Sequence, residues 1–216
     1  MNGELFGGPG PGPAREEIAP GAVLLRGLAL GVERELLAAL DHVAAQAPFR
    51  HMVTPGGRAM SVATTNCGDA GWVSDRRGYR YVRQDPQSGK PWPALPPVFL
   101  GLAAQAAAQA GYPGFVPDAC LVNRYVPGAR MSLHQDRDER DFGQPIVSVS
   151  LGLPAVFQFG GMERSAPASR HVLLHGDAVV WGGPARLRYH GVLALKEGNH
   201  PEQGRARVNL TLRKAM

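Results

Sequence analysis

Residues 146–161 read IVSVSLGLPAVFQFGG, two short apolar runs divided by a Leu-Pro turn. The same pattern continues on both sides as short segments separated by Pro, Gly and Asp turns: ACLVNRYV (119–126), HVLL (171–174), AVVWGG (178–183), RLRYHGV (186–192) and RVNLTLR (207–213). Roughly seven short strands within about a hundred residues are typical of a β-sandwich or jelly roll. We therefore expect a jelly-roll core over about residues 119–213.

Two helices are expected before this core. Residues 32–46 carry Leu36, Leu40 and Val43 at helical spacing, which predicts an amphipathic helix. The alanine-rich stretch 97–110 ends at Gly111, a typical helix stop. The predicted fold class is therefore α+β but mostly β: N-terminal helices flank a double-stranded β-helix of the cupin-like type, in a single domain over residues 21–216.

Two segments lack apolar periodicity. Residues 1–20 are rich in Gly and Pro, and we expect a flexible arm there. Residues 50–92 contain TPGG, NCG and several aromatic and arginine side chains, and read as loop-rich. Long loops of this kind are often functional, so this stretch is predicted to be a lid.

Composition narrows the class of protein further. The chain has 216 residues, an ordinary hydrophobic fraction of 44% and only two cysteines, with no CxxC pair. No apolar run approaches the roughly 18 residues that a membrane span needs, and no secretory signal is recognisable. We expect a cytoplasmic monomer with reduced thiols and no membrane association. The net charge of +5 favours a polyanionic partner, although basic proteins need not bind nucleic acid.

The triplet His134-Gln135-Asp136 follows a turn and could present one imidazole and one carboxylate on the same side of an extended segment. Such a triplet is common by chance. His190, at the end of RLRYH, is the best candidate for a second imidazole because its strand could lie beside the first. Two imidazoles and one carboxylate form the facial triad of non-haem Fe(II) oxygenases, which leaves positions open for co-substrate and O2.

The terminal strand RVNLTLR strengthens this interpretation. Strand alternation puts Arg207, Asn209 and Arg213 on one face. These arginines could simply face solvent, but a dicarboxylate such as 2-oxoglutarate needs cationic forks, and arginine pairs with carboxylates in a bidentate manner. Asn123 and Tyr125 share a face of another strand and add an amide and a phenol. The sequence thus predicts a 2-oxoglutarate pocket beside the metal.

Several longer runs are recognisable: MVTPGG, TNCG, GYPGF, PDACLVNRY, SLHQD, PIVSVSLGLPAVFQFGG, HGDAVVWGG, RLRYHG and the final RxNxTxR. Together they closely resemble the AlkB family of alkylated-nucleic-acid repair dioxygenases over about residues 20–213. The resemblance implies Fe(II) as the metal and 2-oxoglutarate and O2 as co-substrates. It implies the same metal ligands and the same pocket residues: His134, Asp136, His190, Asn123, Tyr125, Arg207, Asn209 and Arg213.

The resemblance also identifies residues 50–92 as a nucleotide-recognition lid. It implies that an extruded base lies between Trp72 and His134, with the Asp138 carboxylate beside it. Contacts to the lesion strand are implied for Tyr79, Arg80, Tyr81 and Arg164. Without the resemblance, Trp72 would be a packing aromatic and Arg164 a surface residue.

The activity that the resemblance implies is oxidative demethylation of bases such as 1-methyladenine and 3-methylcytosine, with release of formaldehyde, succinate and CO2. An unpaired base costs least to extrude, so methylated single-stranded DNA is the expected substrate, with duplex DNA and RNA left open.

Three alternatives compete with this reading. The first is a hydroxylase of a protein or small molecule with the same iron site, against which the interleaved aromatic and basic residues of the lid argue. The second is a non-catalytic nucleic-acid-binding module on this scaffold. The third is a zinc-dependent cupin, which would not need Arg207 and Arg213.

Overall fold

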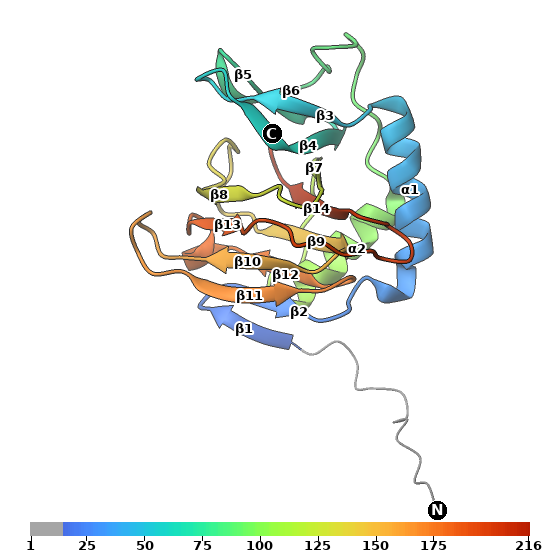
Figure 1. Ribbon diagram of the computed structural model, residues 1–216. Coiled ribbons are helices and arrows are strands. Elements are labelled where there is room, and N and C mark those ends of the chain that lie inside the picture. The colour runs from blue at the N-terminus through green and yellow to red at the C-terminus, as the bar shows by residue number, and fades with distance from the viewer. Residues whose placement is uncertain (1–14) are drawn as a thin grey trace, which may run out of the picture.

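The computed structural model describes residues 15–216. Two antiparallel sheets face each other, and a two-stranded hairpin stands at one end of them (Figure 1). The larger sheet has eight strands in the order β1-β2-β12-β9-β14-β7-β4-β3, and the smaller has four in the order β11-β10-β13-β8. This is the double-stranded β-helix that the strand pattern predicted.

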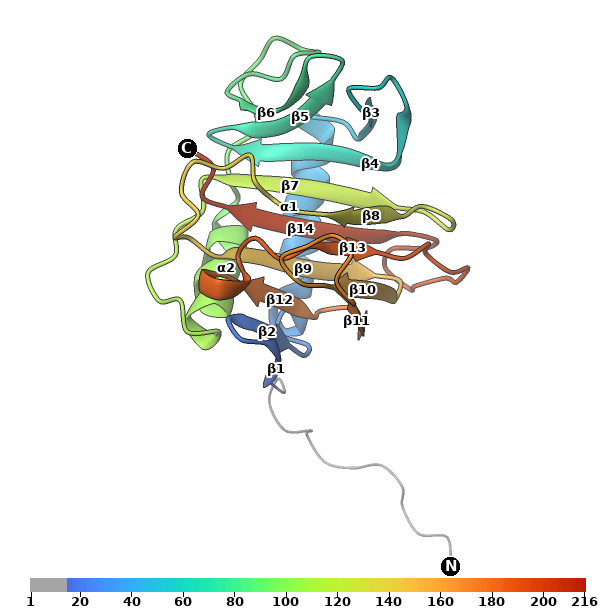
Figure 2. The same cartoon turned by 90° about the vertical axis from the view of Figure 1, so that its left-hand side faces the viewer.

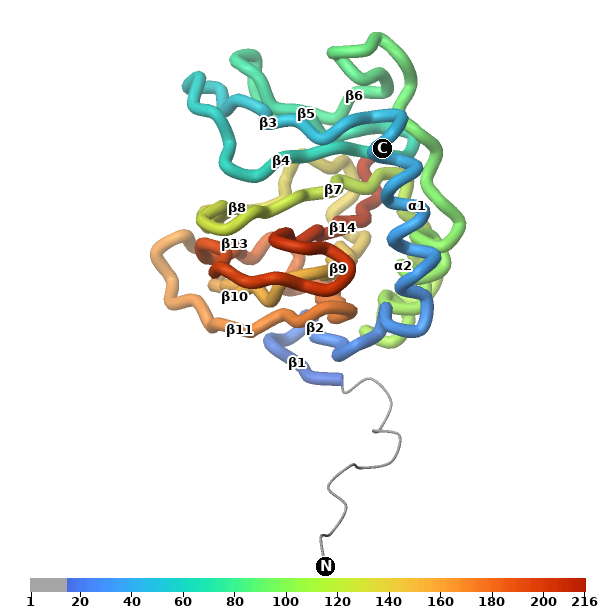
Figure 3. The backbone as a smooth tube through the Cα atoms, turned by 45° about the vertical axis from the view of Figure 1, so that its right-hand side comes forward, coloured from blue at the N-terminus to red at the C-terminus, as the bar shows by residue number. Residues whose placement is uncertain are grey.

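The larger sheet combines strands from both ends of the chain. In sheet order these are β1 (Arg15–Ala19), β2 (Ala22–Leu25), β12 (Ala178–Trp181), β9 (Ile146–Gly152), β14 (Arg207–Arg213), β7 (Ala119–Tyr125), β4 (Ala59–Gly68) and β3 (Arg50–Val53). The last strand of the chain, β14, is inserted between β7 and β9 at the centre of this sheet. The long excursion between β13 and β14 that brings it there is visible in Figure 3.

The smaller sheet covers one face of the larger, as Figure 2 shows. Its strands are β11 (Ser169–Leu173), β10 (Ala155–Phe159), β13 (His190–Val192) and β8 (Met131–His134). The hairpin consists of β5 (Gly71–Asp75) and β6 (Gly78–Val82). Aromatic side chains of both sheets, including Phe157, Phe159 and Trp181, fill the space between them.

Two helices cover the other face of the larger sheet: α1 (Glu33–Gln46) and α2 (Pro97–Gln109). Short 3-10 turns, η1 (Leu30–Val32) and η2 (Gly183–Ala185), precede α1 and follow β12. Leu36, Leu40 and Phe99 on the helices belong to the same buried apolar cluster as Val208 and Leu210 of β14. Both helices lie where the sequence predicted them. Their apolar stripes cover the face of the larger sheet that points away from the smaller sheet, which explains why that face is apolar.

Three sequence expectations need correction. Residues 1–14 of the predicted arm lie outside the described part of the chain, but residues 15–19 form the edge strand β1 and pair with β2. Within the predicted lid, 50–92, strands β3 and β4 both belong to the main sheet, where β4 pairs with β3 and β7, so only the remainder of that stretch, including the hairpin of β5 and β6, lies outside this sheet. The segment RLRYHGV is a strand only at β13, because η2 and a turn occupy the residues before it.

Within residues 15–216, neither helix has the length and hydropathy that crossing a membrane requires.

The apolar side of β14 carries a large share of the core packing. Leu210 is fully buried between the sheet and the helices. Replacing it with alanine leaves a cavity, so Leu210→Ala should lower the free energy of unfolding by about 3 kcal/mol. Urea unfolding measures this loss. Val172, which is 50% exposed, provides the control: Val172→Ala should change stability by less than about 0.5 kcal/mol. Equal effects would contradict this account of the core.

Candidate active site

Three potential metal ligands converge in one cavity. His134 ends β8 and His190 begins β13, and the two residues are direct partners in the antiparallel pairing of these strands. Asp136 follows β8 by two residues. The closest ligand atoms are His134 Nε2 to Asp136 Oδ1, at 3.6 Å, and His190 Nε2 to Asp136 Oδ2, at 3.7 Å. All three ligand atoms lie within 4.8 Å of one another.

These spacings fit a single metal ion. Two atoms that are each about 2.1 Å from one ion can be no more than about 4.2 Å apart, and adjacent octahedral ligands are closer. The observed separations therefore need only a small contraction. Two imidazoles and one carboxylate on one side of an ion are the donor set of Fe(II) oxygenases.

The pKa shifts of His190 and Asp136 suit metal binding, whereas the Asp136 carboxylate raises the pKa of His134 despite its burial, so a metal ion would compete with a proton there. Burial and the neighbouring imidazole of His134 lower the pKa of His190 to about 4, so its ring is neutral near neutral pH. Burial acts to raise the pKa of Asp136, but the Arg213 guanidinium outweighs it and holds that pKa well below its usual range. A neutral imidazole and an ionised carboxylate are the forms that coordinate a metal ion.

Beside the triad, strands β7 and β14 supply the polar wall of the cavity, whose volume is about 670 Å³. Asn123 pairs with Asn209, and Tyr125 with Arg207, in the register of these strands. All four residues are buried and line the cavity. Strand alternation therefore brings the predicted co-substrate residues together as expected.

Arg207 tests whether these residues fit 2-oxoglutarate. Its guanidinium stacks on the Tyr125 ring at 5.0 Å, and Nη2 donates to Ser150 Oγ at 2.9 Å. Its Nε and Nη1 are buried without a hydrogen-bond partner, and so is Asn123 Oδ1. No carboxylate of residues 15–216 forms an ion pair with Arg207. A buried cation left unpaired is costly, and burial lowers the pKa of Arg207. An incoming carboxylate would satisfy it, so the residues fit the co-substrate.

Arg213 lines the cavity and also contacts a member of the triad. Its Nη2 and Nε donate to Asp136 Oδ2 at 2.6 and 3.1 Å. The terminal strand was expected to offer the dicarboxylate two arginine forks, Arg207 and Arg213. Arg213 lines the cavity, but its guanidinium already donates to the candidate metal ligand Asp136.

Sequence reasoning missed the residues that hold this wall in place. Ser148 Oγ accepts a hydrogen bond from Asn209 Nδ2 at 2.8 Å, and Thr211 Oγ1 donates to Asn209 Oδ1 at 2.9 Å. Ser148 and Ser150 alternate with apolar residues in IVSVSLG. Polar residues at alternate positions of a buried strand were the signal that could have found them.

At the mouth of the cavity the hairpin presents two aromatic rings. Trp72 of β5 and Tyr79 of β6 stack with their centroids 5.5 Å apart, and both line the cavity. Trp72 Nε1 donates to Asp138 Oδ2 at 2.7 Å. The structure thus brings Trp72, Tyr79 and Asp138 together in the cavity that His134 also lines.

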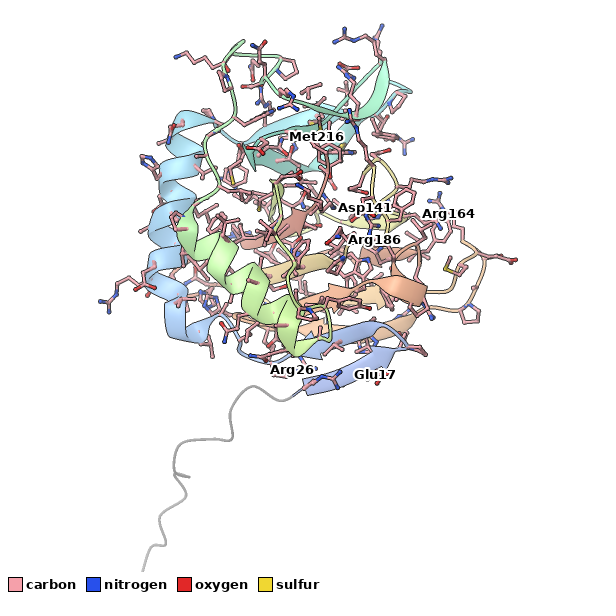
Figure 4. All side chains as sticks on the ribbon, turned by 180° about the vertical axis from the view of Figure 1, so that it is seen from behind. Glu17, Arg26, Asp141, Arg164, Arg186 and Met216 are labelled. Atoms are coloured by element: carbon pink, nitrogen blue, oxygen red, sulfur yellow. The ribbon has the colours of Figure 1, made fainter. Side chains whose placement is uncertain are left out.

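The remaining substrate candidates are placed differently. Arg164 is exposed, lines the cavity and lies on the loop between β10 and β11; its side chain is labelled in Figure 4. Arg80 lies on the hairpin face opposite Tyr79 and Tyr81, and its Nη2 contacts Asp75 Oδ2 at 2.7 Å. Tyr81 Oη donates to Glu139 Oε1 at 2.7 Å. Neither Arg80 nor Tyr81 lines the cavity. The alternation of side chains along a strand already placed Arg80 on the face opposite Tyr79 and Tyr81.

The jelly roll and the His-Asp-His triad define an oxygenase that uses Fe(II) and 2-oxoglutarate. The sequence model of the family described as the 2OG-Fe(II) oxygenase superfamily matches residues 21–213. The chain is 60% identical over 203 residues to the alpha-ketoglutarate-dependent dioxygenase AlkB of Salmonella typhimurium, and 58% identical to that of Escherichia coli. In each case 94% of both chains is covered. A solved structure described as "The structure of OsALKBH1" superposes with a TM-score of 0.80 at 29% identity, covering 93% of this chain and all of that one.

The chain belongs to the AlkB family of Fe(II)- and 2-oxoglutarate-dependent dioxygenases, whose members repair alkylated nucleic acids by oxidative demethylation. The expected fold, enzyme class and cofactors are therefore confirmed.

Removal of the unpaired Arg207 guanidinium should affect co-substrate affinity and the stability of the ligand-free protein in opposite directions. Arg207→Met should weaken 2-oxoglutarate binding about 100-fold, since a hydrogen bond to a charged group contributes about 1.5–3 kcal/mol. The ligand-free variant should nevertheless be at least as stable as the wild type, because a buried unpaired charge is gone. Thermal unfolding with Mn(II), with and without 2-oxoglutarate, measures both effects. Arg205→Met is the control, since Arg205 is exposed and paired with Glu197.

Proposed function

We propose that this chain demethylates N-alkylated bases such as 1-methyladenine and 3-methylcytosine, and that single-stranded DNA is its preferred substrate. The observation that carries the proposal is one cavity bordered by three kinds of chemistry: a His-Asp-His triad, a buried unpaired arginine, and a stacked aromatic pair beside a carboxylate. A small dicarboxylate and a cationic planar base are the two ligands that these surroundings suit.

Each wall has its own role in the proposal. Iron is held by His134, Asp136 and His190. 2-Oxoglutarate is held by Arg207 at its distal carboxylate, with Asn123, Tyr125 and Asn209 around it and Arg213 at the metal end. When bound, iron, 2-oxoglutarate and O2 supply the oxidation of an N-methyl to an N-hydroxymethyl group, which leaves as formaldehyde while succinate and CO2 are formed.

The protein's own residues orient and desolvate the reactants. Arg213 fixes the Asp136 carboxylate by two hydrogen bonds to Oδ2, which leaves Oδ1 for the metal. Phe157 and Trp181, packed near His190, keep the floor of the cavity apolar. The residues do no acid–base chemistry in this scheme; they place a methyl group beside the metal and exclude water.

The lid residues account for base selection. Trp72 stacks on the extruded base from one side, and the imidazole of His134 lies on the other. Methylation at adenine N1 or cytosine N3 makes the ring cationic, which favours stacking on Trp72 and proximity to the Asp138 carboxylate. Tyr79 and the exposed Arg164 at the rim contact the strand.

Strand preference follows from the cost of extrusion. A base must leave its stack to reach the triad at the bottom of the cavity, and a methylated Watson–Crick edge is already unpaired. A single strand lowers that cost further. The net charge of +5 favours any polyanionic strand, so DNA and RNA are to be compared directly.

The direct test is incubation of the protein with Fe(II), 2-oxoglutarate, O2 and oligonucleotides that carry 1-methyladenine or 3-methylcytosine, as single-stranded DNA, duplex DNA and RNA. We expect loss of one methylene mass from the base and release of an equal amount of formaldehyde, fastest with single-stranded DNA. Asp136→Ala is the inactive control. Formation of succinate without any loss of mass from the oligonucleotides would contradict the proposal.

Removal of the stacking ring should separate base binding from co-substrate chemistry. Trp72→Ala should lower kcat/KM for the methylated oligonucleotide by about 10- to 100-fold, since stacking on a base contributes about 1–3 kcal/mol. Decarboxylation of 2-oxoglutarate without substrate should remain. Val116→Ala removes an exposed apolar side chain elsewhere and should change neither rate. A Trp72→Ala variant that loses both activities would argue against a stacking role.

A further inference from the structure

The loop after Asp136 carries two consecutive carboxylates, Asp138 and Glu139. The hairpin of β5 and β6, here called the lid hairpin, contacts both. Trp72 Nε1 donates to Asp138 Oδ2, and Tyr81 Oη donates to Glu139 Oε1, each at 2.7 Å. Trp72 and Tyr81 are directly opposite each other in the pairing of β5 with β6. The hairpin is therefore joined to the loop at two adjacent points.

The two carboxylates have different surroundings. Asp138 is exposed, whereas Glu139 is only 6% exposed. Asp138 is thus accessible to a ligand in the cavity, while Glu139 faces protein groups. The proposed reaction gives Glu139 no part, so its burial among polar groups needs another explanation.

Glu139 connects to the backbone of Asp136 through Arg186. Arg186 Nη2 donates to Glu139 Oε2 at 3.0 Å, and Arg186 Nη1 donates to the backbone oxygen of Asp136 at 2.8 Å. Arg186 Nε also donates to the backbone oxygen of Gln144, so the guanidinium spans the whole loop. Figure 4 shows Arg186 in the interior of the molecule.

Glu139 also contacts the arginine that holds the Asp136 side chain. Arg213 Nε lies 3.4 Å from Glu139 Oε1, and Arg213 Nη1 donates to Tyr81 Oη at 3.4 Å. Two acidic and two arginine side chains are therefore buried together, with Glu139 between the arginines. Removing one member leaves the others unbalanced in a dry environment.

We infer that Glu139 is a positioning residue: with Arg186 and Arg213 it fixes Asp136, and through Tyr81 it links the position of Asp136 to the lid hairpin that carries Trp72. The inference rests on the proposed function, because it takes Asp136 as a metal ligand and Trp72 as the base-stacking residue. Tyr81 acts through Glu139 and does not touch the substrate.

The expected consequence is coupling between base binding and co-substrate use. A base that stacks on Trp72 restricts the motion of the lid hairpin. The hydroxyl of Tyr81, the cross-strand partner of Trp72, then holds Glu139 in place. If that hydrogen bond is lost, the orientation of Asp136 no longer depends on an occupied lid. 2-Oxoglutarate is then consumed without demethylation, so the yield of formaldehyde per succinate falls.

Three variants test this inference. Glu139→Gln keeps the shape but removes the charge between the arginines, and Tyr81→Phe removes only the hydroxyl. Tyr112→Phe is the matched control: Tyr112 Oη donates a 2.8 Å hydrogen bond to the backbone oxygen of Gly21, and neither residue lines the cavity. Thermal unfolding establishes that each variant is folded.

Two readouts are taken on each variant. The first is the affinity for Co(II) with 2-oxoglutarate under anaerobic conditions, followed by visible absorption. The second is formaldehyde released per succinate formed with a methylated single-stranded oligonucleotide. Glu139→Gln should weaken Co(II) binding about tenfold, as is usual for residues that orient a metal ligand, and should lower the ratio. Tyr81→Phe should lower the ratio severalfold with a smaller effect on Co(II) affinity. Tyr112→Phe should change neither.

A double variant strengthens the test. If Tyr81 acts only through Glu139, Tyr81→Phe combined with Glu139→Gln should have the same product ratio as Glu139→Gln alone. Wild-type Co(II) affinity and product ratio in both single variants would overturn the inference. Should Glu139→Gln fail to fold, the ratio in Tyr81→Phe decides. A wild-type protein that releases no formaldehyde would sink the proposed function, and the Co(II) affinities would still decide whether Glu139 positions Asp136.

Discussion

The central strands β7 and β14 must satisfy two surroundings at once. On one face their side chains pack against the helices, where Val122 and Leu210 lie in a continuous apolar core. On the other face Asn123, Tyr125 and Arg207 line the cavity. Because strand side chains alternate, a slip of one residue in register would bury the polar set under the helices and expose leucines to the co-substrate. Register therefore fixes the core and the site together.

The two buried arginines of β14 show how neighbours decide the role of a residue. Arg213 contacts Asp136 and Glu139, so its charge is balanced within the protein. Among residues 15–216, the polar and aromatic partners of the Arg207 guanidinium are the Ser150 hydroxyl and the face of Tyr125. The first arginine stabilises a metal ligand, and the second is prepared for an anion. Their spacing in the strand is regular, yet of these two arginines only Arg207 has buried donors without a partner among residues 15–216.

The site is assembled from three separate parts of the fold. The smaller sheet contributes the paired histidines, the larger sheet the co-substrate wall, and the hairpin the aromatic rings. The loop that contains Asp136, Asp138 and Glu139 touches all three parts. In the proposed function, this arrangement lets a base, a dicarboxylate and a metal ion meet in one cavity, while each is held by a different element. It also gives the lid a direct physical connection to the metal site.

The sequence alone determined most strands of the core after residue 119, the two helices, the triad and the polar face of β14, because alternation and helical spacing are local properties of the chain. It did not predict β1 or the strands β3 to β6, which lie in the stretches read as an arm and a loop-rich lid. It also carried motifs specific enough to name the family. The tertiary structure decided which charges are paired. Tyr81 and Arg80 were expected to contact substrate, yet Glu139 and Asp75 engage them. Ser148 and Ser150 had a local signal in the alternation of their strand, but Glu139 and Arg186 had none, since hydrogen bonds between residues far apart in the chain arise only when the sheets pack. Local pattern fixes which face a side chain occupies, and only packing fixes what it meets there.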